Sequence, residues 1–343
     1  MTEVLARRHD VALLDLDGVV YIGDHAVPGA AEGLEAAQAA GMRLAFVTNN
    51  AGRSPETVAE HLTSLGIPAS AEDVVTSAQA GAELLAARID PGSRVLAIGG
   101  PGVALAIERS GLTSVDPDDA SSIDVAAVLQ GFGRNVAWTD LSAAALAVQR
   151  GAIWVLTNPD LTLPLPDGPA PGNGSLARAV ESAAGRAPDD VAGKPYPALM
   201  QTSIERTKAR DPLVVGDRLD TDIAGACRTG VASLLVLTGI SGIADALSAR
   251  AGERPDYVGL DLTALTAPPA ATGGAGGPQP DESGWRLGAA RAWVEEGELR
   301  VECGENWLAG LQCGCAASWA GEPSPRVAAA AAQLERVRRT VVP

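Results

Sequence analysis

The fold is predicted first from the segment Val11-Ala12-Leu13-Leu14-Asp15-Leu16-Asp17-Gly18. Its four leading apolar residues predict a strand that is buried on both faces, as in a parallel sheet covered by helices. Asp15 and Asp17 stand two residues apart at its end, so in extended chain both side chains point the same way. Gly18 allows a tight departure from the strand. At the carboxyl end of a parallel strand, the two carboxylates would face the crevice where open α/β sheets bind ligands.

Outward from this stretch, short apolar runs alternate with helical patterns over two-thirds of the chain. Further strands are expected at 43–47, 94–98, 124–129, 152–156, 212–215 and 232–237. Helices are expected at 29–40, 55–65, 77–88, 103–110, 139–150, 175–184 and 197–206. Such alternation predicts an α/β protein with a doubly wound parallel sheet, and the strands of so long a chain can divide between two sheets.

The composition changes near residue 268. Residues 268–278 are rich in Pro, Ala and Gly and predict a flexible linker, placed at 268–281. Beyond the linker, residues 290–294 and 299–301 predict a hairpin, and residues 326–339 predict an Ala-rich helix. Four of the six Trp residues follow the linker, so we expect residues 282–343 to form a small α+β module with a core of its own and an open role.

Composition also disfavours several classes of protein. Of the 343 residues, 46% are hydrophobic and 20% are charged, a balance that can build a large core. The net charge of −16 argues against nucleic acid or an anionic membrane as the main partner. No apolar run approaches the ~18 residues of a membrane span. The first eight residues do not resemble a secretory signal, and four Cys residues are too few for a disulfide framework, so a cytoplasmic protein is expected.

Three further segments place polar residues where predicted strands end. Thr48-Asn49-Asn50 offers a hydroxyl and two amides, Gly193-Lys194-Pro195 offers one cation, and residues 216–222 contain three carboxylates. Alone, Thr48-Asn49-Asn50 could equally be a helix cap or a turn, the lysine could be a solvated side chain, and one of the three carboxylates could be a cap, although three caps are not expected. Their joint occurrence at successive strand ends indicates one crevice. Carboxylates on one face repel each other, which favours either a divalent cation or an ionised nucleophile beside a protonated acid.

Together these segments resemble the haloacid dehalogenase superfamily of aspartyl phosphohydrolases. The four motifs of that superfamily occur in order as Asp15-x-Asp17, Thr48, Lys194 and Gly216-Asp217-x-x-x-Thr221-Asp222. The resemblance covers about residues 10–265, and residues 157–160 and 171–175 are similar to the subgroup with a large α/β cap. It implies a Rossmann-like core formed by 1–76 and 190–267 with an inserted α/β cap at 77–189.

The resemblance further implies a chemical role for each matched residue. Asp15 would attack phosphorus and form an aspartyl-phosphate, and Asp17 would act as general acid and then as general base. The acid at position 17 favours a phosphatase or a mutase over a dehalogenase or an ion pump. The phosphoryl oxygens would be bound by Thr48, Asn49, Asn50 and Lys194. The implied Mg²⁺ ligands are the Asp15 and Asp217 carboxylates and the Asp17 backbone carbonyl, with Asp222 in or near this set.

An inserted cap would exclude water and bulky substrates, so the substrate is expected to be a small phosphorylated metabolite. Specificity would come from cap loops at 130–134 and 157–160, in which Arg134 and Asp160 are candidates for contacting the substrate. The Ala-, Gly- and Arg-rich composition and the appended tail resemble actinobacterial members of the subgroup. That resemblance implies glycerol 3-phosphate as the substrate.

Several alternatives stay open at this point. The substrate could instead be phosphoglycolate, a nucleotide or a sugar phosphate, and the reaction could be that of a phosphomutase. A non-catalytic binding protein is the least favoured alternative, and a homo-oligomer through the cap or the C-terminal module is open. Gly99-Gly100-Pro101-Gly102 lacks the lysine of a P-loop and is interpreted as a structural turn. Cys303, Cys313 and Cys315 have no nearby His and are interpreted as free thiols and not as a zinc site.

Overall fold

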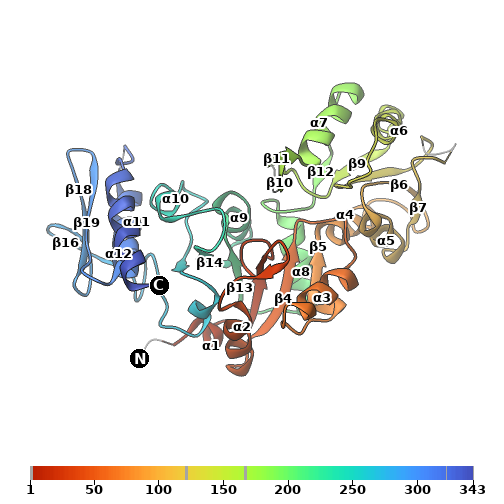
Figure 1. The fold of residues 1–343 in the computed structure, drawn as a ribbon. Coiled ribbons are helices and arrows are strands. Elements are labelled where there is room, and N and C mark those ends of the chain that lie inside the picture. Colours follow the sequence, from red (N-terminus) through yellow and green to blue (C-terminus); the bar gives the residue numbers. More distant parts are fainter. Residues whose placement is uncertain (1–2, 120–122, 166–167, 322, 343) are drawn as a thin grey trace. The chain divides into compact units, whose positions relative to one another are not determined.

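A computed structural model describes residues 3–119, 123–165, 168–321 and 323–342 (Figure 1). The predicted domains also include residues 1–2, 120–122, 166–167, 322 and 343, which lie outside the described residues. The chain divides into two compact units, of which the first comprises Met1–Ala45 and Thr207–Pro343 and the second comprises Phe46–Arg206. Within the described residues, no helix combines the length and the apolar character needed to cross a lipid bilayer.

The first unit contains a parallel sheet with the strand order β15-β14-β13-β1-β4. Its strands are β1 (Val11–Leu14), β4 (Arg43–Thr48, which ends in the second unit), β13 (Pro212–Gly216), β14 (Ala232–Val236) and β15 (Tyr257–Gly259). Val11 lies opposite Pro212 and Leu14 opposite Val215, and all four residues of β1 are buried. Because the chain extends the sheet in both directions from β1, the predicted doubly wound α/β fold is confirmed.

Short helices and one small hairpin accompany this sheet. The N-terminal part contains α1 (Leu5–Arg8), the hairpin β2 (Tyr21–Ile22) and β3 (His25–Ala26), and α2 (Ala30–Ala39). The part after β13 contains a π-helical turn η2 (Leu219–Ile223), α9 (Ala224–Thr229), α10 (Ile243–Leu247) and the 3₁₀ turn η3 (Leu262–Leu265). Helix α2 matches the predicted helix at 29–40 within one residue at each end.

The C-terminal region continues the first unit as an antiparallel meander with two helices. Its elements are β16 (Gln279–Asp281), β17 (Gly284–Leu287), β18 (Ala290–Glu295), β19 (Glu298–Glu302), α11 (Trp307–Ala320) and α12 (Ala328–Val341). The predicted hairpin is confirmed as β18–β19, and its turn residues Glu296 and Gly297 both have positive φ, 51° and 75°. Figure 1 shows α11 and α12 beside these strands.

The expectation that this region has a core of its own is wrong. Eleven of the fourteen residues of α11 are buried, and six of them form one apolar cluster with Leu247 of α10, Leu235 of β14 and Val258 of β15. In the predicted linker, Ala270, Ala271 and Thr272 are buried, and the Gln312 side chain donates a hydrogen bond to the Ala271 carbonyl at 2.7 Å. The C-terminal region is therefore built onto the sheet of the first unit by shared apolar packing.

The three thiols of the C-terminal region, Cys303, Cys313 and Cys315, are buried and free. Burial raises the pKa of the Cys313 thiol to about 11 and raises that of Cys315 further still. At neutral pH both side chains are therefore protonated thiols that pack as small apolar groups.

The second unit contains its own parallel sheet, with the strand order β12-β9-β8-β6-β7. These strands are β6 (Arg94–Ile98), β7 (Thr113–Val115), β8 (Ala127–Gln130), β9 (Ile153–Leu156) and β12 (Asp190–Val191). The remaining strands are β5 (Val74–Thr76), which pairs with the end of β4, and the hairpin β10 (Thr162–Leu165) and β11 (Gly168–Pro171). A second sheet built from the predicted strands at 94–98, 124–129 and 152–156 is thus confirmed.

Helices cover both faces of this second sheet, because alternate strand residues point to opposite sides. Leu96 and Trp154 pack with α6 (Trp138–Gln149) and α7 (Asn173–Ala184), whereas Val95 and Val155 pack with α4 (Ser77–Ala86) and α5 (Pro101–Arg109). The other helices are α3 (Pro55–Ser64), the 3₁₀ turn η1 (Ala71–Asp73) and α8 (Pro197–Thr207). The domain boundaries at 77 and 189 stay predictions.

Candidate active site

The Asp15–Gly18 segment leaves the sheet directly after β1. The Asp15 amide donates to the Val215 carbonyl at 2.9 Å, which continues the pairing of β1 with β13 by one residue. Gly18 has a φ of 85°, in the left-handed region, and its amide donates to the Tyr21 carbonyl at 2.8 Å. The Asp17 side chain is exposed, whereas Asp15 is half-buried. The chain turns sharply here because Gly18 adopts a conformation that an L-residue with a Cβ rarely takes.

Three carboxylates gather at this end of the sheet in the first unit. Single oxygens of Asp15, Asp217 and Asp222 all lie within 4.8 Å of one another. Asp217 follows β13 and Asp222 lies on the π-helical turn η2, and each is only 1% exposed. Because three like charges at this spacing, two of them buried, repel strongly, the group is stable only with protons or a cation between the oxygens.

Glycines leave the space that these carboxylates occupy. A Cβ added at Gly18 would lie 2.6 Å from Asp217 Oδ2, and one added at Gly239 would overlap the same atom outright. A Cβ at Gly216 would overlap the Asp222 side chain. Gly239 is not among the site residues predicted from the sequence. The signal that could have found it is its position just after β14, at another strand end on the same edge of the sheet.

Backbone amides fix the orientation of the two buried carboxylates. The Ile240 amide donates to Asp217 Oδ2 at 2.7 Å, and the Arg218 amide donates to Asp222 Oδ2 at 3.2 Å. Asp220, the other acid of this segment, instead accepts from the Arg218 guanidinium at 3.0 and 2.8 Å. That hydrogen bond from Arg218 lowers the pKa of the exposed Asp220 carboxyl. The segment thus directs two of its three acids toward Asp15.

The donor set of this group fits a hard divalent cation. Mg²⁺ and Ca²⁺ prefer oxygen ligands, and all three residues supply carboxylate oxygens, two of them held by backbone amides. The Asp17 side chain is not among the three. A ligand role for the Asp17 backbone carbonyl stays a prediction.

The second unit holds the other predicted site residues, around the end of β4 and the loop before α8. Thr48 and Lys194 are 3% and 2% exposed. The Lys194 ammonium donates to the Val47 carbonyl at 3.2 Å, and Thr48 Oγ1 accepts from the Asn50 amide at 3.0 Å. Asn49 bonds to Lys194 through its side chain, and Asn50 Oδ1 accepts from the Gly52 amide at 2.9 Å. The four residues therefore form two hydrogen-bonded pairs, Thr48 with Asn50 and Asn49 with Lys194.

The two cap-loop candidates differ in their surroundings. Asp160 Oδ2 accepts from the Asn49 side chain at 3.4 Å, so it lies beside the pair formed by Asn49 and Lys194. Arg134 is exposed on the loop after β8. Substrate contact by either residue stays a prediction.

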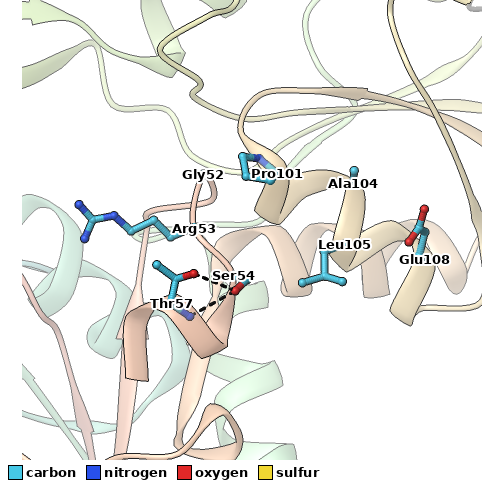
Figure 2. Close-up of a pocket in the computed structure, with 8 residues that line it drawn as sticks. All are labelled: Gly52, Arg53, Ser54, Thr57, Pro101, Ala104, Leu105 and Glu108. Atoms are coloured by element: carbon cyan, nitrogen blue, oxygen red, sulfur yellow. Dashed lines mark hydrogen bonds between the residues drawn. The ribbon is translucent and has the colours of Figure 1, made fainter. Parts of the chain in front are cut away.

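A surface pocket of the second unit is lined by none of the predicted site residues (Figure 2). It is lined by Gly52, Arg53, Ser54, Thr57, Pro101, Ala104, Leu105 and Glu108. Gly100 and Gly102 lie where a Cβ would meet the backbone of Gly52 and of Arg53, and the Gly102 amide donates to the Gly52 carbonyl. This close approach of two backbones agrees with the interpretation of residues 99–102 as a structural turn.

Comparison with known proteins identifies the family. A model of haloacid dehalogenase-like hydrolases matches residues 12–113, and a second, HAD-hydrolase-like model matches residues 191–265. The D-glycerol 3-phosphate phosphatase of Mycobacterium tuberculosis is 47% identical over 265 residues, which are 76% of this chain and 72% of that protein. The chain belongs to the haloacid dehalogenase-like hydrolases.

Two further relatives of this haloacid dehalogenase-like hydrolase are informative. The acid sugar phosphatase of Staphylococcus haemolyticus is 36% identical over 231 residues, 67% of this chain and 85% of that protein. The crystal structure of the Mycobacterium tuberculosis glycerol phosphate phosphatase in complex with magnesium matches with a TM-score of 0.86 and 40% identity, over 98% of this chain and 99% of that one. That match also takes in the C-terminal region. With these named phosphatases as relatives, the hydrolase is a phosphoric monoester hydrolase.

Proposed function

We propose that this hydrolase releases inorganic phosphate from a small phosphate monoester with Mg²⁺ as its cofactor, and that glycerol 3-phosphate is the substrate. The group of Asp15, Asp217 and Asp222 carries the proposal, because three converging carboxylates suit a divalent cation. The relatives named for glycerol 3-phosphate and for magnesium support the choice of substrate and of metal. A cytoplasmic location and a homo-oligomer stay predictions.

The proposed chemistry divides one displacement into two. An Asp15 oxygen attacks phosphorus, and the bond between phosphorus and the ester oxygen breaks as Asp17 gives that oxygen a proton. Asp17, now ionised, takes a proton from water, and the resulting hydroxide displaces Asp15 from phosphorus. Phosphate leaves, and both carboxyl groups return to their starting protonation states. The exposed side chain of Asp17 suits an acid that must meet first a leaving group and then a water.

Charge on the transferring phosphoryl group must be matched by fixed positive groups. Asp15, Asp217 and Asp222 would hold Mg²⁺, which neutralises both the carboxylates and the phosphoryl oxygens when it is bound. Thr48, the Asn49 amide, Asn50 and Lys194 would bind those oxygens directly. The burial of Lys194 supports this role, because a buried ammonium interacts more strongly with an anion than a solvated one does.

The decisive experiment measures phosphate release from a panel that contains glycerol 3-phosphate, phosphoglycolate, nucleoside monophosphates and sugar phosphates. The native chain is compared in Mg²⁺ and in EDTA, alongside Asp15→Asn and the matched control Asp220→Asn. We expect metal-dependent release, highest kcat/KM with glycerol 3-phosphate, and loss of turnover only in Asp15→Asn. Asp220→Asn should retain activity because Asp220 pairs with Arg218 outside the carboxylate group.

Other outcomes would redirect the proposal in specific ways. A higher kcat/KM with a sugar phosphate would replace the substrate and retain the reaction, as the relatedness to an acid sugar phosphatase allows. Conversion of a substrate into its positional isomer without free phosphate would indicate a phosphomutase. Full activity of Asp15→Asn would rule out the aspartyl-phosphate intermediate.

A further inference from the structure

The Asn49 side chain holds both backbone polar groups of Lys194. Asn49 Oδ1 accepts from the Lys194 amide at 2.8 Å, and Asn49 Nδ2 donates to the Lys194 carbonyl at 3.1 Å. An amide is one of the few side chains that can donate and accept at once, so a single residue satisfies both groups. The two bonds fix the orientation of the Lys194 backbone relative to the end of β4.

The backbone before Lys194 approaches Asn49 closely. A Cβ at Gly193 would lie 2.6 Å from Asn49 Oδ1 and would overlap the Thr157 carbonyl. Glycine at position 193 therefore lets the Lys194 loop reach the amide. The sequence motif Gly193-Lys194-Pro195 and the Asn49 side chain thus belong to one arrangement.

Asn49 is itself held by neighbouring polar side chains. Its backbone carbonyl accepts from Ser77 Oγ at 2.7 Å and from Asn158 Nδ2 at 2.8 Å. The Asn158 carbonyl accepts from Asn173 Nδ2 at 2.8 Å, and Asn173 is 1% exposed. These bonds hold the Asn49 backbone in place, so its side chain meets Lys194 from a fixed position.

Lys194 is fixed at its other end as well. Its side chain is buried, and the ammonium donates to the carbonyl of Val47, one residue before Thr48. A long side chain held at both its backbone and its charged group loses most of its rotamer freedom before any ligand binds. Fixed donors of this kind stabilise developing charge without reorganising during the reaction.

We propose that the Asn49 side chain is a positioning residue for Lys194, in addition to the role of the Asn49 backbone amide. The amide holds the Lys194 backbone so that the ammonium is placed for the phosphoryl oxygens. This inference rests on the proposed phosphatase function and on the role of Lys194 in it. Asn49 acts through Lys194 and contributes little once the ammonium is gone.

A double-mutant cycle tests this dependence with the full chain and the best substrate of the panel. Lys194→Ala is expected to lower kcat by roughly a hundredfold or more, and Asn49→Ala by about ten- to a hundredfold, because small displacements of a catalytic group have effects of that size. The double variant should be no more than about twofold slower than Lys194→Ala, since the two effects are expected not to add.

Further variants separate positioning from loss of structure. Ser54→Ala removes the N-cap of α3 five residues along the chain, where Ser54 Oγ accepts from the Thr57 amide at 3.2 Å (Figure 2). It should lower the unfolding midpoint without changing kcat. If Asn49→Ala does not fold, Asn49→Asp retains the size and the acceptor and should show the same dependence on Lys194.

Two results would overturn the inference, and they are distinguishable. Additive losses of kcat in the double variant would mean that Asn49 acts independently of Lys194. An unchanged kcat in Lys194→Ala would remove the proposed role of Lys194 and, with it, the reason for positioning that residue. Metal-dependent phosphate release by the native chain would leave the proposed reaction standing in both cases.

Discussion

Two polar groups of the molecule are held in opposite ways. In the first unit, three like-charged carboxylates converge where glycines leave room for them. In the second unit, buried side-chain amides donate hydrogen bonds to backbone carbonyls. The carboxylate group is Asp15, Asp217 and Asp222, and the amide group is Asn158 and Asn173.

The difference lies in what each group does for the folded chain. Converging charges oppose folding until a cation neutralises them, so the carboxylate group serves binding at the expense of stability. Buried amides that donate to backbone carbonyls rigidify the chain, and removal of one leaves its acceptors with a bond fewer. Substitutions of the carboxylates should therefore change activity more than stability. Substitutions of the amides should change stability more than activity.

The largest expected effect is that of Asp217→Asn. Loss of one charge should lower kcat by roughly a hundredfold or more and raise the Mg²⁺ concentration required. Without metal, the variant should be more stable than the native chain by about 1 kcal/mol, because repulsion within the group falls. Turnover against Mg²⁺ concentration and urea unfolding in EDTA measure the two effects. Unchanged Mg²⁺ dependence with lower stability would give Asp217 a structural role only.

Gly239→Ala should lower the Mg²⁺ affinity of the carboxylate group without changing its charge. The added Cβ would overlap Asp217 Oδ2, so the carboxylate must move. We expect about ten- to a hundredfold weaker Mg²⁺ binding, as when the support of a metal ligand is disturbed. Calorimetric titration with Mg²⁺ measures the change. Gly273→Ala is the matched control, because nothing lies within 4 Å of a Cβ at that position. Equal Mg²⁺ affinities for the two variants would refute the space argument.

Asn173→Ala should act mainly on stability. It removes hydrogen bonds to the carbonyls of Asn158 and Gln130, at 2.8 and 3.2 Å, and leaves both buried acceptors with one bond fewer. A loss of about 1–3 kcal/mol in the free energy of unfolding is expected, with kcat within about threefold of the native value. Gln149→Ala, which removes an exposed amide bonded to the Ala183 carbonyl, should change stability far less. Similar losses of unfolding free energy in the two variants would contradict the argument that burial gives the Asn173 hydrogen bonds their larger effect.

An exposed ion pair gives the smallest expected effect. The hydrogen bond from Arg286, together with those from Ser283, holds the pKa of the Asp281 carboxyl at about 2. A lowered pKa stabilises the fold above the usual value of 3.8 for Asp, and this contribution is lost as the pH falls through about 2. Arg286→Ala should raise the pKa of Asp281, measured by NMR titration, and leave the neutral-pH unfolding midpoint nearly unchanged. A large drop in that midpoint would contradict this view of the exposed pair.

The sequence predicts the long, periodic elements well and the short ones poorly. The strands at 11–14 and 94–98 and helices such as 55–65 are confirmed because their apolar patterns run over several residues. β5, β7, β12 and β15 were not expected, since two or three residues carry no detectable period. Helix α11 is not predicted from the sequence either. A helix buried on nearly all sides shows no polar face, and its Gly and Cys residues are weak helix formers.

For the candidate site, the motifs predict the charged residues and miss their supports. Asp15, Asp217 and Asp222 follow strands, and the common edge of a parallel sheet brings them together. The amide of Ile240 and the space at Gly239 depend on a loop whose conformation no local pattern encodes. The bonds between Asn49 and Lys194 join residues 145 positions apart, so only the folded chain brings them together.

Helix α11 has a consequence for handling the protein at the bench. Because it shares an apolar cluster with α10 and β15, an expression fragment that stops near residue 268 would leave Leu247 and Val258 facing solvent and would accumulate in inclusion bodies. A protease that nicks the Gly-rich stretch at 273–277 would have a different result. The two pieces would elute together on gel filtration and separate only in denaturant, because the cut peptide bond contributes nothing to the packing that joins them.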